Sequence, residues 1–192
     1  MTDSIKKILF TGSLNDEYLN ELVADLSEAI DEQKLELFSY SNSNNQNQLS
    51  NVKPLIESDV CKMDLIVSIG GDGTMLKSSK LASNHDVPIT GINKGRLGFL
   101  TDINPELVSD ALKEIIQGDY QIESRMLLDV KISNGNEERF IGHAVNDLVI
   151  NKTKTGRMIN VQTSINDTYV NSNEGDGYIV STPTGSTAYS LS

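Results

Sequence analysis

The sequence contains few of the features that cross-link a protein or anchor it in a membrane. It has 192 residues but a single cysteine, Cys61, so neither an internal disulfide nor a cysteine-based zinc cluster is expected. No apolar run approaches the ~18 residues that a membrane span requires. The first residues also lack the long apolar stretch of a secretory signal. These features predict a cytoplasmic protein without a membrane partner.

Basic residues are also scarce. The chain has 16 Lys and Arg against 27 Asp and Glu, which gives a net charge of −11 at pH 7. A surface for nucleic acid or anionic lipid would need many lysines and arginines, so neither partner is expected. A small anionic ligand is compatible with this charge, because it needs only a local pocket. Hydrophobic residues make up 38% of the chain, which is enough for a folded core.

The first part of the chain alternates short apolar runs with helical patterns. The expected strands are residues 6–10, 35–40, 64–69 and 87–92, and the expected helices are residues 16–33, 74–82 and 104–118. Asn104 and Pro105 are typical of a helix start, and Gly118 is typical of a helix end. The polar residues 41–51 are expected to form a mobile loop. The alternation predicts an α/β domain, Rossmann-like or flavodoxin-like, with a mostly parallel sheet covered on both faces.

The second part of the chain has extended segments instead of helices. Residues 126–133 and 139–150 flank Asn134-Gly135, which is typical of a tight hairpin turn. Further extended segments are residues 159–165, 168–170 and 178–181. We therefore expect the α/β domain over residues 1–120 and an antiparallel β-sandwich domain over residues 121–192. We expect this sandwich to be truncated at its C-terminal end, because the strands present would leave unpaired edges.

A glycine-rich turn, Gly70-Gly71-Asp72-Gly73, follows the strand expected at residues 64–69. Glycines between a strand and a helix let backbone amides approach a phosphate. The turn is not a P-loop, because the Gly-Lys-Ser/Thr ending is missing, and it is not the dinucleotide-binding fingerprint, because it lacks that spacing. The carboxylate of Asp72 would repel phosphates unless it accepts a proton from a substrate hydroxyl or helps to hold Mg²⁺. Both roles indicate phosphoryl transfer to an alcohol; the structural alternative is that Asp72 only caps the helix.

Two further groups of polar residues are candidates for ligand binding. Asn146-Asp147 is suited to hold a ribose diol, although local sequence alone favours a simple turn between strands. Asp176 and the hydroxyl-rich residues 181–190 offer many hydrogen-bonding groups around glycine and proline, with an exposed linker as the alternative. Lys94 lies in a glycine-punctuated loop, which explains this lysine nearly as well as contact with an anion does.

Together these motifs resemble those of the NAD kinase family. The similar segments, in family order, are the turn at residues 70–74, the glycine-rich block at residues 91–102, the pair Asn146-Asp147 and the hydroxyl-rich block at residues 176–190. The turn alone is shared with diacylglycerol and sphingosine kinases and, more loosely, with phosphofructokinases. The last block is much more specific. The resemblance therefore covers most of residues 64–192.

The resemblance implies transfer of the γ-phosphate of ATP to the 2′-hydroxyl of the adenosine ribose of NAD, giving NADP. Asp72 would be the general base, with Gly73 close to the dinucleotide. Asn146 and Asp147 would hold ribose hydroxyls and the neighbouring diphosphate. The other implied contacts are Asp176, Thr187, Ala188, Tyr189 and Ser190 at the adenine and nicotinamide ends, with Lys77 and Arg157 as weaker candidates for phosphate contact. Mg²⁺ would be bound mainly through the phosphates of ATP, and the protein would be a homo-oligomer, a dimer or tetramer.

Two other functions stay open. A lipid kinase would share the glycine turn, but no stripe for acyl chains accompanies the hydroxyl-rich block. A non-catalytic fragment would bind NAD without phosphorylating it. One position departs from the family pattern, because Glu174 stands where many relatives carry a basic residue. This disfavours a direct phosphate contact at residue 174.

Overall fold

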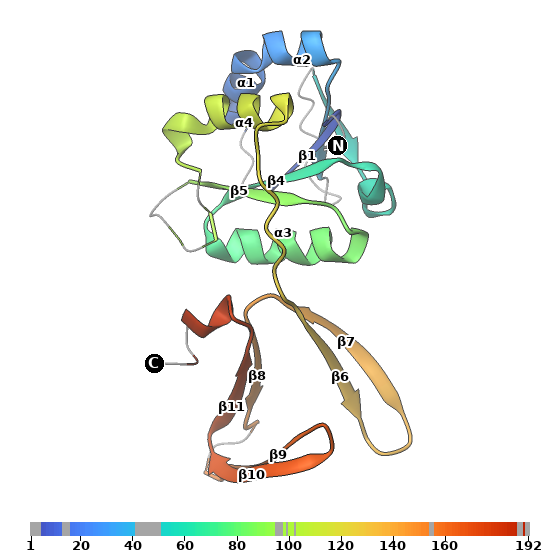
Figure 1. The fold of residues 1–192 in the computed structure, drawn as a ribbon, viewed down its shortest axis with the longest axis vertical. Coiled ribbons are helices and arrows are strands. Elements are labelled where there is room, and N and C mark those ends of the chain that lie inside the picture. Colours follow the sequence, from blue (N-terminus) through green and yellow to red (C-terminus); the bar gives the residue numbers. More distant parts are fainter. Residues whose placement is uncertain are drawn as a thin grey trace. The chain divides into compact units, whose positions relative to one another are not determined.

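The chain divides into two compact units, Met1–Glu123 and Ser124–Ser192 (Figure 1). The computed structural model describes residues 5–12, 16–40, 51–94, 98, 100–101, 103–153, 156–187 and 190. The loop expected at residues 41–51 therefore lies, apart from Asn51, outside the described residues.

The described part of the first unit contains a five-stranded parallel sheet in the order β3-β2-β1-β4-β5. The strands are β1 (Lys7–Gly12), β2 (Glu36–Tyr40), β3 (Val52–Leu55), β4 (Leu65–Gly70) and β5 (Ile89–Asn93). The helices are α1 (Asp16–Asp25), α2 (Ser27–Gln33), α3 (Asp72–His85) and α4 (Val108–Gln117), with 3-10 turns η1 (Glu57–Lys62) and η2 (Pro105–Leu107). This architecture confirms the predicted Rossmann-like α/β fold, in which the strand order reverses between β1 and β4.

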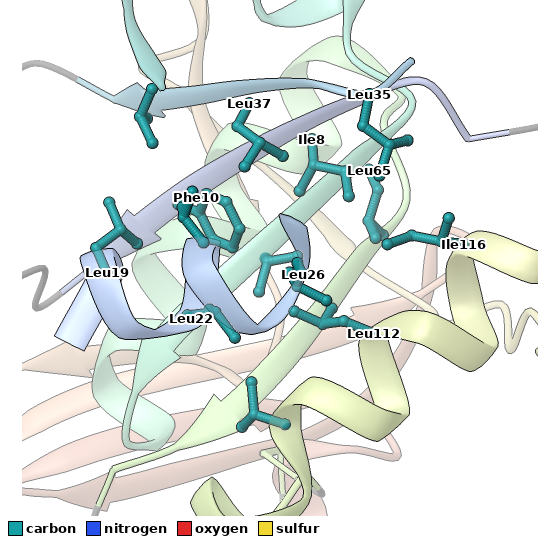
Figure 2. Packing of buried hydrophobic residues seen from close by; sticks show 14 of the residues in the cluster. Ile8, Phe10, Leu19, Leu22, Leu26, Leu35, Leu37, Leu65, Leu112 and Ile116 are labelled. Atoms are coloured by element: carbon teal, nitrogen blue, oxygen red, sulfur yellow. The ribbon is translucent and has the colours of Figure 1, made fainter. Parts of the chain in front are cut away.

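Helices cover both faces of the sheet, with α1, α2 and α4 on one face and α3 on the other (Figure 1). On the first face, Ile8 and Phe10 of β1 belong to one core cluster with Leu112 of α4 (Figure 2). On the other face, Leu9 of β1 belongs to a second cluster with Ala82 of α3. β1 is thus buried on both sides, which explains its continuous apolar run.

The helical segment formed by η2 and α4 has the predicted residues at its two ends, although the α-helix itself begins only at Val108, after Leu107, which makes no side-chain capping bond. The Asn104 side chain accepts a hydrogen bond from the Glu106 amide at 3.2 Å, and Pro105 opens η2 directly before α4. Gly118 has φ +90°, and its amide donates to backbone carbonyls in the last turn of α4. Both caps satisfy backbone groups that a helix end leaves without partners.

Two details of the first unit differ from the prediction. The helix expected over residues 16–33 is interrupted at Leu26, whose φ and ψ are −91° and 0°. Apolar spacing cannot reveal this break, because Leu26 is fully buried and continues the pattern. β3 was missed because it contains Pro54, which has no amide to donate. The strand tolerates this proline because β3 lies at the edge of the sheet and pairs only with β2.

The second unit consists of antiparallel pairs, as predicted. β6 (Leu128–Ser133) pairs with β7 (Glu138–Ala144), β8 (Asp147–Asn151) with β11 (Gly177–Ser181), and β9 (Ile159–Ile165) with β10 (Thr168–Gly175). The turn η3 (Gly185–Thr187) follows β11. Gly135 of the predicted hairpin has φ +93°, and Asn166 and Asp167 between β9 and β10 have φ 49° and 62°. Positive φ at both Asn166 and Asp167 suits the twist of a two-residue hairpin turn. The turn at Asn134-Gly135 is longer than the predicted tight turn, because β6 ends at Ser133 and β7 begins at Glu138.

Candidate functional site

The glycine turn stands at the carboxyl edge of the parallel sheet, beside the end of β1. β4 ends at Gly70, Gly71 is the N-cap of α3, and Asp72 is the first residue of that helix. β1 pairs with β4 up to its own last residue, Gly12, which lies opposite Ile69, one residue before the end of β4. Because the strand order reverses here, this edge is where open α/β sheets bind their ligands.

The glycines serve different purposes on the two sides of this turn. A Cβ added at Gly12 or Gly70 would come within 2.6 or 2.5 Å of the Thr74 side chain, so both strand ends approach the first turn of α3 closely. A Cβ added at Gly71 or Gly73 would meet no atom of the described residues within 4 Å. The start of α3 therefore has an open side, where its first amides can receive an anion.

The carboxylate of Asp72 is oriented by the loop that follows β5. The Leu100 amide donates a hydrogen bond to Asp72 Oδ1 at 3.2 Å. Gly98 lies against the same group, because a Cβ added there would stand 2.5 Å from Asp72 Cγ and 2.8 Å from Oδ2. Gly71, not Asp72, is the N-cap residue, and it makes no side-chain capping bond. The half-buried carboxylate of Asp72 is thus held by a second loop at the same edge of the sheet.

A buried chain of hydroxyl groups anchors α3 below the turn. Ser78 Oγ of α3 lies 2.8 Å from Thr11 Oγ1 of β1, and it accepts a hydrogen bond from Ser68 Oγ of β4 at 2.9 Å. All three side chains are buried. The chain therefore fixes the helix that begins at Asp72 against the two strands on either side of the order reversal.

Two lysines lie at or near the turn. Lys77 is exposed on α3, four residues after Gly73 and therefore on the same side of the helix. Lys94 follows β5, and its amide donates to the Gly70 carbonyl at 3.2 Å. Lys94 Nζ lies 5.1 Å from the centre of the Tyr18 ring, a cation–π contact. Burial raises the pKa of Tyr18, which keeps the phenol protonated beneath the lysine.

In the second unit, the residues around the start of β8 and the end of β11 form one hydrogen-bonded cluster. The Ser181 hydroxyl donates to Asp147 Oδ1. The Thr182 hydroxyl donates to the Val145 carbonyl at 2.6 Å and accepts from the Gly185 amide at 3.0 Å. A Cβ added at Gly185 would stand 2.6 Å from Asp147 Oδ1. The cluster joins the predicted Asn-Asp pair to the hydroxyl-rich block.

Asn146 contributes an acceptor that has no hydrogen-bond partner among the residues described. Its backbone carbonyl accepts from the Thr182 amide at 2.8 Å, but its side-chain Oδ1 is buried and unpaired. A buried acceptor left without a donor costs about 1–3 kcal/mol. A ligand hydroxyl bound at this cluster would remove that cost.

Asp176 lies away from the Asn146-Asp147 cluster. In the β8–β11 ladder Gly177 pairs with Asn151, whereas Ser181 pairs with Asp147. Four residues of strand separate the two ends by about 13 Å. The exposed Asp176 carboxylate forms an ion pair with Lys152 Nζ at 2.6 Å.

The remaining predicted residues occupy the end of the chain and one loop. Thr187 Oγ1 donates to the Thr184 carbonyl at 3.3 Å, and Ser190 Oγ donates to the Ser186 carbonyl at 3.3 Å. Arg157 is exposed. The predicted positions Ala188 and Tyr189 lie outside the described residues.

Within the described ranges, no group of three or more His, Cys, Asp or Glu side chains is arranged to hold a metal ion. Mg²⁺ in phosphoryl-transfer sites is commonly held by one or two carboxylates together with substrate phosphates. Asp72 at the open turn suits that mode of binding. Separately, none of the helices described here has the length and apolar character needed to cross a membrane.

The fold and the turn define a doubly wound α/β protein of the class that binds its ligand outside the carboxyl ends of the strands. The family model described as the ATP-NAD kinase N-terminal domain matches residues 13–120, and the one described as the ATP-NAD kinase C-terminal domain matches residues 145–192. The chain belongs to the NAD kinase family, which confirms the resemblance drawn from its motifs.

Known relatives agree with this assignment. The NAD kinase of Heliobacterium modesticaldum is 45% identical over 139 residues, which are 72% of this chain and 49% of that protein. Yeast NADH kinase, solved with NADH, has a TM-score of 0.83 at 24% identity, over 98% of this chain and 61% of its own. An NAD kinase from Archaeoglobus fulgidus, solved with ATP, has a TM-score of 0.67 at 23% identity, over 97% of this chain and 64% of its own. These two structures show the same fold; the chain spans about half the length of the sequence relatives.

Sequence reasoning missed three residues that shape the turn. Gly12 lies just beyond the strand expected at residues 6–10, Ser78 was expected only as part of a helix, and Gly98 only as part of the glycine-rich block at residues 91–102. Gly12 is the last residue of β1, and Gly98 comes five residues after the end of β5; β1 and β5 are the strands on either side of β4. Glycine at or shortly after the end of neighbouring parallel strands is the signal that would have found these two glycines.

Proposed function

We propose that the protein is an NAD kinase, which transfers the γ-phosphate of ATP to the 2′-hydroxyl of the adenosine ribose of NAD and so forms NADP. The observation that carries this proposal is the Asp72 carboxylate, held in the first turn of α3 at the ligand-binding edge of the sheet. A carboxylate that faces phosphates needs a compensating role, and proton acceptance from a hydroxyl supplies one. Membership of the NAD kinase family supports the choice of acceptor.

In the proposed reaction, Asp72 accepts the proton of the 2′-hydroxyl as its oxygen attacks the γ-phosphorus. The new O–P bond forms while the bond to the β-phosphate oxygen breaks, and ADP leaves. Gly73 leaves the helix start accessible, and Lys77 contacts a phosphate as a point charge. Mg²⁺ would be held mainly through the phosphates of ATP, near the Asp72 carboxylate, and would supply positive charge against the negative charge of those phosphates.

The second unit is proposed to bind the rest of NAD. The buried, unpaired Oδ1 of Asn146 accepts a ribose hydroxyl, and Asp147, oriented by Ser181, holds a neighbouring group. Further contacts are proposed for Arg157, Asp176, Thr187, Ala188, Tyr189 and Ser190. Because Lys152 is paired with Asp176, NAD would have to share or displace this ion pair at that end of the ladder.

We also propose the wider organisation of the protein. The two compact units support an α/β domain over residues 1–120 and an all-β NAD-binding domain over residues 121–192. The protein is also proposed to be a homo-oligomer, a dimer or tetramer, in the cytoplasm. Exposed apolar side chains such as Phe140, Ile165 and Tyr169 support a further contact on the second unit. Sedimentation of the complete protein tests the oligomer; a monomer would contradict it.

The substitution Asp72→Asn tests the proposed base, because it removes the proton acceptor and keeps the shape of the side chain. With ATP, Mg²⁺ and NAD, turnover in the complete protein is expected to fall by about 10²–10⁴. The affinity for NAD, measured by calorimetry, should change by no more than a few-fold. Asp86→Asn is the matched control, because exposed Asp86 ends the same helix and lies outside the site.

The outcomes separate the three candidate functions. Full turnover in Asp72→Asn would remove the base assignment. Phosphorylation of diacylglycerol without any NADP would favour a lipid kinase. Binding of NAD by the unmodified protein without NADP formation would favour a non-catalytic dinucleotide-binding protein.

A further inference from the structure

We propose that Gly98 is a positioning residue for the catalytic carboxylate: its lack of a side chain provides the space in which the Asp72 carboxylate lies. The inference rests on the proposed function, since it concerns the group proposed as the base. It also gives a role to the glycine-rich block after β5, which the proposed reaction leaves without one.

Gly98 leaves no room for a side chain beside the Asp72 carboxylate. A Cβ added at Gly98 would lie 2.5 Å from Asp72 Cγ and 2.8 Å from Oδ2, and it would also collide with Oδ1. Every heavy atom of the carboxyl group is therefore closer than the ordinary contact distance of about 3.5 Å. The glycine backbone forms the wall against which this carboxylate rests.

Leu100 completes the support from the same loop. Its amide donates to Asp72 Oδ1 at 3.2 Å, which fixes the direction of one carboxylate oxygen. A space limited on one side by Gly98 and a hydrogen bond from Leu100 restrict the carboxylate to one orientation. The substrate hydroxyl needs this restriction, because proton transfer requires hydrogen-bonding geometry.

A methyl group at residue 98 is expected to move the carboxylate and leave the fold intact. The atoms that the new methyl group would meet are at the end of the Asp72 side chain, which can rotate, whereas the methyl group is attached directly to the backbone of residue 98. To restore an ordinary contact, the distance between Asp72 Cγ and the added Cβ must increase from 2.5 Å to about 3.5 Å, so the carboxyl carbon must move by about 1 Å. A misplacement of about 1 Å at a reacting group costs on the order of 10²-fold in rate.

A double-mutant cycle in the complete protein tests the proposal. Gly98→Ala is expected to lower kcat for NADP formation by about 10²-fold, with the KM for NAD within about 3-fold. In the Asp72→Asn background the same change is expected to lower the residual kcat by less than about 3-fold, because there is no base left to misplace. A merely structural role would lower kcat by the same factor in both backgrounds, and that result would overturn the proposal.

Gly118→Ala is the matched control. Gly118 ends α4 at φ +90°, where an alanine is strained, and it is not part of the site. This variant is expected to have a lower melting temperature and an unchanged kcat per folded molecule. It separates loss of stability from misplacement of the carboxylate.

A crystal structure of Gly98→Ala gives an answer even if no NADP is formed. Displacement of the Asp72 carboxyl carbon from its position in the unmodified protein is expected; an unmoved carboxylate would overturn the positioning role. If the unmodified protein forms no NADP, the proposed function fails by itself. If it forms NADP and Gly98→Ala is as active, only the positioning role fails.

Discussion

The hydroxyl chain beneath the glycine turn predicts a measurable cost for one small substitution, Ser78→Ala. Ser78 Oγ is the middle member of the chain, with Thr11 Oγ1 at 2.8 Å and Ser68 Oγ at 2.9 Å. The three side chains are buried, at 5%, 5% and 0% exposure for Ser78, Thr11 and Ser68, so water cannot easily replace the lost hydroxyl. Removing it leaves two hydroxyl groups without that partner.

The expected magnitude follows from these two hydrogen bonds. Each contributes about 0.5–1.5 kcal/mol, so their loss costs about 1–3 kcal/mol. Alanine is the better helix former, and this recovers up to about 0.5 kcal/mol within α3. The free energy of unfolding of the first unit should therefore fall by about 0.5–2.5 kcal/mol. Since α3 begins at Asp72, looser anchoring should also reduce turnover.

Urea unfolding followed by far-ultraviolet circular dichroism measures this change. The described α-helices all belong to the first unit, so the helical signal reports its unfolding. The urea midpoint should fall by about 1 M, with an unchanged slope. Ser83→Ala is the matched control on the same helix, because Ser83 Oγ makes a solvent-exposed bond to the Lys80 carbonyl at 3.1 Å. That variant should stay within about 0.5 kcal/mol of the unmodified protein.

The two serine variants together show whether the buried hydroxyl chain stabilises the first unit and positions the start of α3. If Ser78→Ala and Ser83→Ala shift the midpoint equally, the buried chain does not stabilise the unit as described. If Ser78→Ala unfolds early but its turnover per folded molecule is unchanged, the chain stabilises the helix without positioning its first residue.

Two other consequences can be checked on the first unit. Leu112→Ala should lower the free energy of unfolding in urea by about 2–5 kcal/mol, because Leu112 is fully buried between α4 and the sheet. Leu107→Ala should lower it little, because the Leu107 side chain is 58% exposed. Equal costs would contradict the placement of Leu112 in the core. The hydrogen bond and charge of Lys53 lower the pKa of Glu36, so the stabilisation from this exposed pair is full above the ordinary carboxyl pKa of 4.5 and is lost as the pH falls through the lowered value. Lys53→Ala should return the pKa of Glu36 toward 4.5 in an NMR titration, and an unmoved value would contradict the pairing.

The sequence predicted most of the fold because its signals are local. The continuous apolar run at Leu65–Gly70 is typical of a strand buried on both faces, and all six of its residues are buried. Asn104 and Gly118 marked the ends of a helix through backbone rules that depend only on neighbours. The sequence did not predict the break at Leu26 or the edge strand with Pro54, because side-chain packing and position in the sheet determine these two features.

The arrangement of the site depends on contacts that no local pattern contains. Ser181 reaches Asp147 because β11 pairs with β8, although the hairpin of β9 and β10 lies between them in the sequence. Gly98 reaches Asp72 because β5 follows β4 in the sheet and both loops leave the same edge. Sequence motifs identified most of the candidate site residues, but strand pairing determined which of these residues contact one another.

A structure of the complete protein with NAD bound tests the central claim most directly. The quantity to measure is the distance from the nearer carboxylate oxygen of Asp72 to the 2′ oxygen of the adenosine ribose. The proposed mechanism predicts about 2.6–3.2 Å, or one bridging water between the two atoms. A carboxylate turned toward solvent, with the ribose bound elsewhere, would contradict the proposed chemistry and leave only membership of the family.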